Sequence, residues 1–188
     1  MIEIRWHGRG GQGAVTAAKL LAAAALRQGK YFQAFPEFGP ERRGAPVQAF
    51  TRISDEPIRI YSQVKSPSVV VVLDSTLIGK VPVTEGLTED GIVVANFAGG
   101  PAELRKKLDL NGRARVFTVD ATAVALRRLG RPITNTPMLG ALARATGMLD
   151  IDTLTVELEE SFGGRFRPEL VKANVQAMRD AYEEVKSE

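Results

Sequence analysis

Blocks of hydrophobic and polar positions alternate along the chain, and they predict strands separated by helices. Residues 69–73 form a continuous run of valine and leucine, which is typical of a strand buried on both faces of a sheet. Residues 11–28 are rich in alanine and leucine, with apolar positions along one broad face, and they predict a helix. Shorter apolar runs predict further strands at residues 2–6, 30–34, 91–96 and 115–119.

Helical patterns dominate the second half of the chain. Before it, residues 47–53 and 58–61 predict an antiparallel hairpin whose turn is residues 54–57. The pattern predicts an α/β fold, a single domain over residues 1–188 with a mainly parallel sheet flanked by helices, a hairpin insertion and a helical C-terminal region. Helices after the hairpin are predicted at residues 101–110, 121–129, 138–146, 152–160 and 168–186.

Composition narrows the classes of function. The chain has no cysteine, which excludes disulfides, thiolate metal sites and cysteine-ligated iron–sulfur clusters from it. Its net charge of +3 is spread out, and no basic run interleaved with aromatic residues points to nucleic acid. The longest apolar runs, residues 20–26 and 69–73, are too short to span a membrane. No signal-peptide pattern precedes the first strand, so we expect a cytoplasmic protein.

A glycine-rich turn follows the first predicted strand. Gly8, Gly10 and Gly13 match the spacing G-x-G-x-x-G between a strand and a helix, the context in which this motif binds phosphate. Glycine permits a tight turn and close approach of a ligand, and the first N–H groups of the following helix face an anion. The alternative is a turn that serves only packing or a protein interface. The candidate residues of the anion site are Arg9, Gly10, Gly11, Gln12 and Gly13.

The loop at residues 36–46 carries three prolines, two glutamates and two arginines. Proline and glycine restrict such a loop to a particular path. It follows a strand, so we expect it at the carboxyl edge of the sheet, where ligands bind in open α/β folds. Arg42 and Arg43 are therefore candidate partners for the same anion as Arg9; the alternative is that the loop's charges form surface ion pairs. Glu37 stands where a dinucleotide site would need an acidic residue, which keeps NAD binding open as a minority interpretation.

The sequence shows no combination of nucleophile, general base or metal ligands that would support catalysis by this chain alone. His7 is the only histidine and has no neighbouring acid or serine elbow, so we predict no catalytic residue. One histidine and scattered carboxylates predict no metal site either. Asp74 and Asp120 each follow a strand and are interpreted as helix caps, with contact to a ligand as the alternative. Thr136 is interpreted in the same way, with Pro137 in the first helical position.

Several segments stand in a distinctive order: residues 4–13 (IRWHGRGGQG), 33–46 (QAFPEFGPERRGAP), 69–74 (VVVVLD), 135–141 (NTPMLGA) and 181–186 (AYEEVK). Together they resemble a known family, the gamma subunits of pyruvate:ferredoxin oxidoreductase and of related enzymes for other 2-oxoacids. The resemblance runs over essentially the whole chain.

The resemblance implies a subunit of an enzyme that decarboxylates a 2-oxoacid, with pyruvate the expected one, to acyl-coenzyme A and CO2 and passes electrons to ferredoxin. The partners would be alpha, beta and delta subunits, which hold thiamine diphosphate and the iron–sulfur clusters, while this chain alone binds no cofactor. Its expected role is assembly and coenzyme A binding, without activity of its own. The phosphates of coenzyme A would meet Arg9, Arg42, Arg43 and the N–H groups of Gly10–Gly13. The alternatives are a stand-alone Rossmann-type oxidoreductase and a structural adaptor without a ligand.

Overall fold

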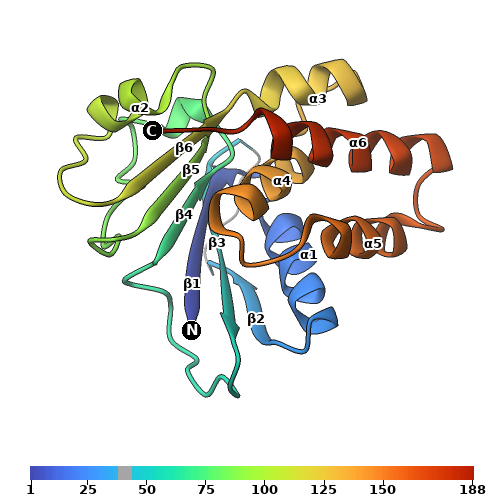
Figure 1. Ribbon diagram of the computed structural model, residues 1–188, viewed down its shortest axis with the longest axis horizontal. Helices are drawn as coiled ribbons and strands as arrows, with labels where there is room; N and C mark the ends of the chain where they lie inside the picture. Colours follow the sequence, from blue (N-terminus) through green and yellow to red (C-terminus); the bar gives the residue numbers. More distant parts are fainter. Residues whose placement is uncertain (38–43) are drawn as a thin grey trace.

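The computed structural model describes residues 1–37 and 44–188 of the chain. One sheet of seven strands in the order β2-β3-β1-β4-β5-β6-β7 runs through the molecule (Figure 1). Its centre, β1-β4-β5-β6, is parallel, whereas β2, β3 and β7 join it antiparallel at the two sides. The strands are β1 (Ile2–Arg9), β2 (Tyr31–Pro36), β3 (Pro46–Ser54), β4 (Val69–Val72), β5 (Ile92–Asn96), β6 (Arg115–Val119) and β7 (Lys186–Ser187).

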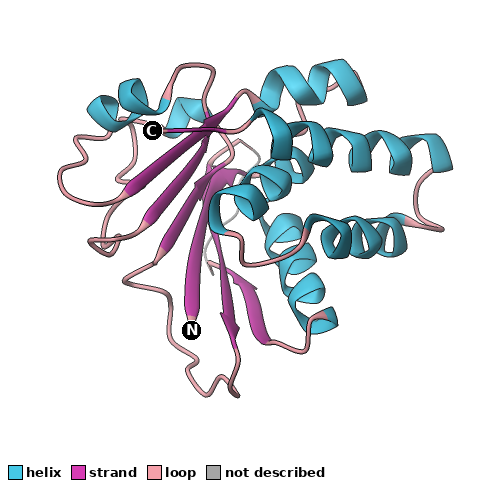
Figure 2. Ribbon diagram, in the orientation of Figure 1, coloured by secondary structure: helices cyan, strands magenta, loops and turns pink. Residues whose placement is uncertain are grey.

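Most of the helices gather on one face of the sheet, as Figure 2 shows. The helices of this layer are α1 (Ala14–Arg27), α3 (Ala121–Leu129), α4 (Asn135–Thr146), α5 (Ile151–Phe162) and α6 (Pro168–Glu184). The opposite face is covered by α2 (Pro101–Lys107) and the short 3-10 helix η1 (Ser75–Leu77). The predicted α/β fold, with its sheet flanked by helices and its helical C-terminal region, is confirmed.

The valines of β4 explain why this strand lies at the centre. Val69 and Val71 belong to the core under the large helical layer, and Val70 and Val72 belong to the core under α2 and η1. Side chains alternate between the two faces of a strand, so only an uninterrupted apolar run can fill both cores. All four valines are buried. The prediction of a strand covered on both faces is therefore confirmed.

The predicted hairpin is wrong in its second strand. β3 pairs with β1 on one side and with β2 on the other, so neither of its edges is free for residues 58–61. Instead Arg52, whose side chain is buried, holds that segment by donating to the carbonyl oxygens of Ile60 at 3.3 Å and Ser62 at 2.7 Å. The hairpin that does form joins β2 to β3.

Helix α4 is the most buried helix and lies between the sheet and α6. It begins at Asn135 after the cap residue Thr134, so the interpretation of Thr136 as the cap is wrong. The Thr136 hydroxyl instead donates to Asn174 Oδ1 of α6 at 2.8 Å, away from solvent. Gly140 allows close packing, because a Cβ atom at this position would lie 1.9 Å from the Met178 carbonyl oxygen of α6.

Trp6 of β1 lies in the core, and its indole N–H donates to Thr51 Oγ1 at 3.0 Å. In the described parts of the chain, no helix has the length and apolar character needed to cross a lipid bilayer.

Candidate functional site

The glycine-rich turn joins the carboxyl end of β1 to α1. The Gly10 N–H donates to the Ala45 carbonyl at 2.9 Å, and the Gly44 N–H donates to the Gly10 carbonyl at 3.1 Å. These two bonds bring the end of the 36–46 loop to the turn, as predicted for that edge of the sheet. Arg42 and Arg43, the predicted basic residues of the loop, lie outside the described residues.

Two glycines of the turn have backbone conformations that other residues rarely adopt. Gly11 has φ +92° and Gly13 has φ +81°, both in the left-handed region. Gly13 also has no room for a side chain, because a Cβ atom there would lie 2.6 Å from Nδ2 of Asn135 at the start of α4. The turn therefore depends on Gly13 twice, for its backbone and for the contact with α4.

A polar network, the turn cluster, consists of Arg9, Gln12, Asp74 and Thr76. Arg9 Nη2 donates to Thr76 Oγ1 at 2.8 Å, and Arg9 Nε lies 3.2 Å from Asp74 Oδ2. Gln12 bridges the cluster, since its Nε2 donates to Asp74 Oδ2 at 2.6 Å and its Oε1 accepts from the Arg9 N–H at 2.7 Å. Arg9 Nη1 also donates to the Gly44 carbonyl at 3.0 Å. The cluster fixes both the turn and the end of the loop.

Asp74 carries a stable negative charge within this cluster. Burial raises the pKa of its carboxyl, but hydrogen bonds from Thr76 and Gln12 and the charge of Arg9 outweigh burial and lower that pKa. Its Oδ1 accepts from the Thr76 N–H at 2.8 Å, so the predicted capping role is confirmed. Asp120 caps α3 in the same way, through the Ala123 N–H at 2.8 Å. Because Asp74 balances Arg9, an anion at the turn would depend mainly on backbone donors.

Those donors lie at the start of α1. The cap residue Gly13 supplies no side-chain acceptor to the first helical turn. Among the described residues, no acceptor is bonded to the N–H groups of Gly11, Gly13 and residues 14–16, whereas the Gly10 N–H donates to Ala45 and the Gln12 N–H to Arg9. Open N–H groups and the helix dipole together favour an anion at such an end. Of the predicted backbone donors, Gly11 and Gly13 remain open in this part of the chain.

The dinucleotide interpretation of Glu37 is not favoured by the strand order. In a dinucleotide-binding fold the second strand lies directly beside the first. Here β3 lies between β2 and β1, and the Glu37 N–H continues the β2 pairing by donating to Gln48 at 2.9 Å. Glu37 is therefore one strand further from the turn than the ribose-binding acid of that fold.

His7 is buried behind the turn and faces a buried arginine. Arg5 Nε donates to His7 Nε2 at 3.1 Å, and Arg5 Nη2 donates to the carbonyls of Val83, at 3.1 Å, and Glu85. Burial, and then the charge of Arg5, lower the pKa of His7 to about 4, although a hydrogen bond with the Val83 backbone opposes this. The imidazole is neutral at pH 7 and serves as an acceptor for Arg5. This geometry supports the interpretation of His7 as an orienting residue rather than a general base.

The neutral imidazole makes folding sensitive to acid. Above its ordinary pKa of 6.5, His7 is neutral in both folded and unfolded chains and contributes no pH dependence. Between 6.5 and about 4 the unfolded chain binds the proton first, so the folded state loses stability as the pH falls. In the His7→Gln variant the amide oxygen can still accept from Arg5 but does not titrate. We therefore expect the free energy of unfolding of this variant to fall by about 2 kcal/mol less than that of the wild type over this pH window. Urea unfolding at both ends of the window measures this difference, and equal losses would contradict it.

Asp74 and Asn135 both contact the glycine-rich turn, and the sequence pattern does not predict these contacts. Asp74 is interpreted from the sequence as a cap, with ligand contact as the alternative, but its bonds to Arg9 and Gln12 are not predicted, although a residue at the end of a parallel strand next to β1 must lie near the turn. Asn135 gave no such signal, because its contact with Gly13 crosses more than a hundred residues. No group of three or more His, Asp or Glu side chains able to hold a metal ion occurs within residues 1–37 and 44–188.

Known proteins match this chain over nearly its whole length. The family model described as "Pyruvate ferredoxin/flavodoxin oxidoreductase" matches residues 3–184. The "Pyruvate/ketoisovalerate oxidoreductases common subunit gamma" of Pyrococcus abyssi is 54% identical over 183 residues, covering 97% of this chain and 96% of that one. The "Pyruvate synthase subunit PorC" of Methanothermobacter marburgensis is 54% identical over 186 residues, covering 99% and 98%.

A solved structure gives the same result in three dimensions. The crystal structure of pyruvate oxidoreductase subunit PORC from Thermotoga maritima matches with a TM-score of 0.86 and 48% identity, covering 99% of this chain and 97% of that one. The resemblance carried by the turn, the loop and the Asn-Thr-Pro segment is confirmed by these matches. The chain belongs to the pyruvate ferredoxin/flavodoxin oxidoreductase family, among its gamma subunits.

Proposed function

We propose that this chain is the gamma subunit of an enzyme that converts a 2-oxoacid, with pyruvate the expected one, to acyl-coenzyme A and CO2 and passes the electrons to ferredoxin. The names of the relatives support pyruvate or a branched 2-oxoacid as substrate. Alpha, beta and delta subunits would supply the thiamine diphosphate and the clusters. The chain has no cysteine with which to ligate a cluster. In this proposal the isolated chain has no turnover, with or without NAD(P)H, and measurable turnover would contradict it.

Within this enzyme the glycine-rich turn would bind the phosphates of coenzyme A. The observation that carries this proposal is the uncapped start of α1, where open N–H groups face the carboxyl edge of the parallel strands. Coenzyme A carries a pyrophosphate and a 3′-phosphate, the groups that helix N-termini and arginines hold best. Arg9 stands at the same turn, and its pairing with Asp74 keeps the guanidinium in place. Arg42 and Arg43 would add charge from the loop.

The Michaelis constant for coenzyme A in the assembled enzyme tests this role. We expect the double change Arg9→Ala with Arg42→Ala to raise that KM at least tenfold, because one charge-assisted contact contributes roughly 1.5–3 kcal/mol. The KM for the 2-oxoacid should stay unchanged. Arg113→Ala is the matched control, since Arg113 pairs with Glu89 at the other end of the sheet. An unchanged KM for coenzyme A in a fully assembled enzyme would exclude Arg9 and Arg42 as ligands of the coenzyme.

A further inference from the structure

The large helical layer contains a pocket of about 630 Å³, here called the helical pocket. It lies between the start of α4 and the segment that joins α5 to α6, and Thr16 of the first turn of α1 lines it. Its apolar wall includes Ile133, Phe162, Phe166 and Leu170. The volume is within the range of about 300–1,000 Å³ that is typical of small-molecule sites.

The apolar wall is unusually open to solvent. Ile133 is 43% exposed, Phe166 47% and Leu170 40%, although each is a large hydrophobic side chain. Phe162 and Phe166 contact each other edge to face, with their ring centroids 5.0 Å apart, so the wall is already ordered. Exposed apolar surface that gathers in a concave site, rather than singly, indicates a place where an apolar group binds.

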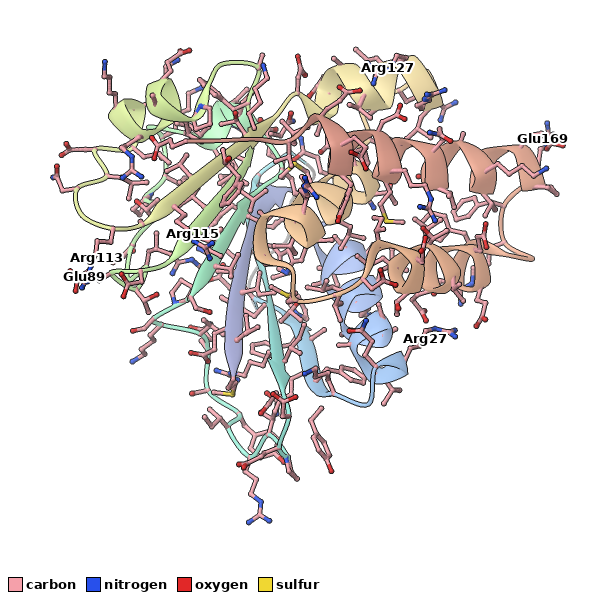
Figure 3. All side chains as sticks on the ribbon, in the orientation of Figure 1. Arg27, Glu89, Arg113, Arg115, Arg127 and Glu169 are labelled. Atoms are coloured by element: carbon pink, nitrogen blue, oxygen red, sulfur yellow. The ribbon has the colours of Figure 1, made fainter. Side chains whose placement is uncertain are left out.

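Two arginines line the same pocket without a counter-charge. Within the described part of the chain, Arg131 and Arg165 form no ion pair, and no aspartate or glutamate lines the pocket. Four other arginines of this layer, Arg27, Arg127, Arg128 and Arg179, each pair with a carboxylate, whereas Arg144 lies over the ring of Tyr182. Figure 3 shows Arg27 and Arg127 projecting at the outside of the layer. The helical pocket is thus both apolar and uncompensated in positive charge.

Asn135 adds a polar group to the wall of the pocket. It is the first residue of α4 and only 7% exposed. Its Oδ1 is buried without a hydrogen-bond partner among the described residues, which is uncommon for a buried polar atom and indicates contact with a water or with a hydrogen-bond donor of a ligand. The start of α4 also contributes the positive end of a helix dipole.

We propose that the helical pocket binds a small amphipathic organic anion. The aromatic or branched aliphatic body of the ligand would pack on Phe162 and Phe166, and its carboxylate, sulfonate or phosphate would pair with Arg131 and Arg165. Such a site goes beyond coenzyme A binding at the glycine-rich turn and does not depend on it.

The test uses the full-length chain and 1-anilinonaphthalene-8-sulfonate, an aromatic anion whose fluorescence rises in apolar sites. We expect saturable binding of one probe per chain, weakened at least tenfold by Arg131→Ala with Arg165→Ala. Arg113→Ala, an exposed arginine paired with Glu89, is the control and should bind the probe like the wild type. The uncharged N-phenyl-1-naphthylamine should bind the wild type and the double variant equally. Thermal unfolding of both variants shows whether the fold is unchanged.

Three results would overturn the inference. Equal binding of the charged probe by the wild type and the double variant would place that probe elsewhere. Loss of probe binding when the chain is assembled with its partner subunits would make the pocket a protein interface instead. Full displacement of the probe by coenzyme A would show that the helical pocket is part of the coenzyme A site and not a separate site. The last result would leave the proposed function standing, and the KM measurement described above decides that proposal separately.

Discussion

Replacement of Gly140 by alanine is expected to lower the free energy of unfolding by about 3 kcal/mol or more. The new methyl group would lie 1.9 Å from the Met178 carbonyl oxygen and 2.8 Å from its carbon, and backbone atoms cannot move aside like a flexible side chain. Helices α4 and α6 would have to separate, which opens the core between them. The higher helix propensity of alanine, about 1 kcal/mol, offsets only part of this loss. Urea unfolding followed by circular dichroism measures the change.

Gly100→Ala is the matched control for this prediction. Gly100 precedes α2 with φ −79°, and a Cβ atom there meets nothing within 4 Å. Because Gly100 is the N-cap of α2, where alanine is less favourable than glycine, we expect its change in unfolding free energy to stay within about 1 kcal/mol. If Gly140→Ala proved as harmless as Gly100→Ala, the close packing of α4 on α6 would be wrong.

Gly13→Ala is expected to cost about 3 kcal/mol of unfolding free energy, from two sources that can be separated. The left-handed backbone of Gly13 contributes roughly 1–2 kcal/mol of strain for a residue with a Cβ atom. The rest arises because Nδ2 and Cγ of Asn135 would lie 2.6 and 3.0 Å from that atom, in a site with little room to relax. Chemical denaturation measures the sum.

Two further variants separate strain from crowding. Gly11→Ala keeps the strain of the left-handed backbone, but a Cβ atom there meets nothing within 4 Å. This change should therefore lower the free energy of unfolding by only about 1 kcal/mol. Adding Asn135→Ala to Gly13→Ala removes the crowding side chain and should recover most of the stability that crowding costs. This recovery appears as an interaction energy of about 1 kcal/mol or more in the double-mutant cycle. Strictly additive effects would show that Asn135 does not contact Gly13.

The elements with a clear period could be predicted from the sequence. The predicted helix at residues 121–129 has the same two ends as α3, and the predicted strand of valines is the central strand β4. The predicted strand at residues 58–61 fails because strand pairing depends on which edges remain free, and β1 and β2 occupy both edges of β3. Local pattern carries no information about that competition.

The candidate site divides in the same way. The motif places Arg9 and Gly10–Gly13 at the turn because strand, glycines and helix are contiguous in the chain. The partners of Arg9 depend on tertiary structure, since Asp74 and Thr76 arrive with β4 and Asn135 with α4. The prediction that Arg42 and Arg43 join the anion site stays a prediction.

Strand β2 has a consequence for how the chain behaves when it is handled by itself. Among the described strands it pairs only with β3, so its other edge leaves main-chain N–H and C=O groups without sheet partners. Tyr31 and Phe32 on this strand are partly exposed. An open edge with aromatic side chains is a template for pairing with any extended segment, including a second copy of itself. Aggregation of the purified chain at high concentration would therefore begin at β2, and a partner that covers this edge would act as a solubilising cap.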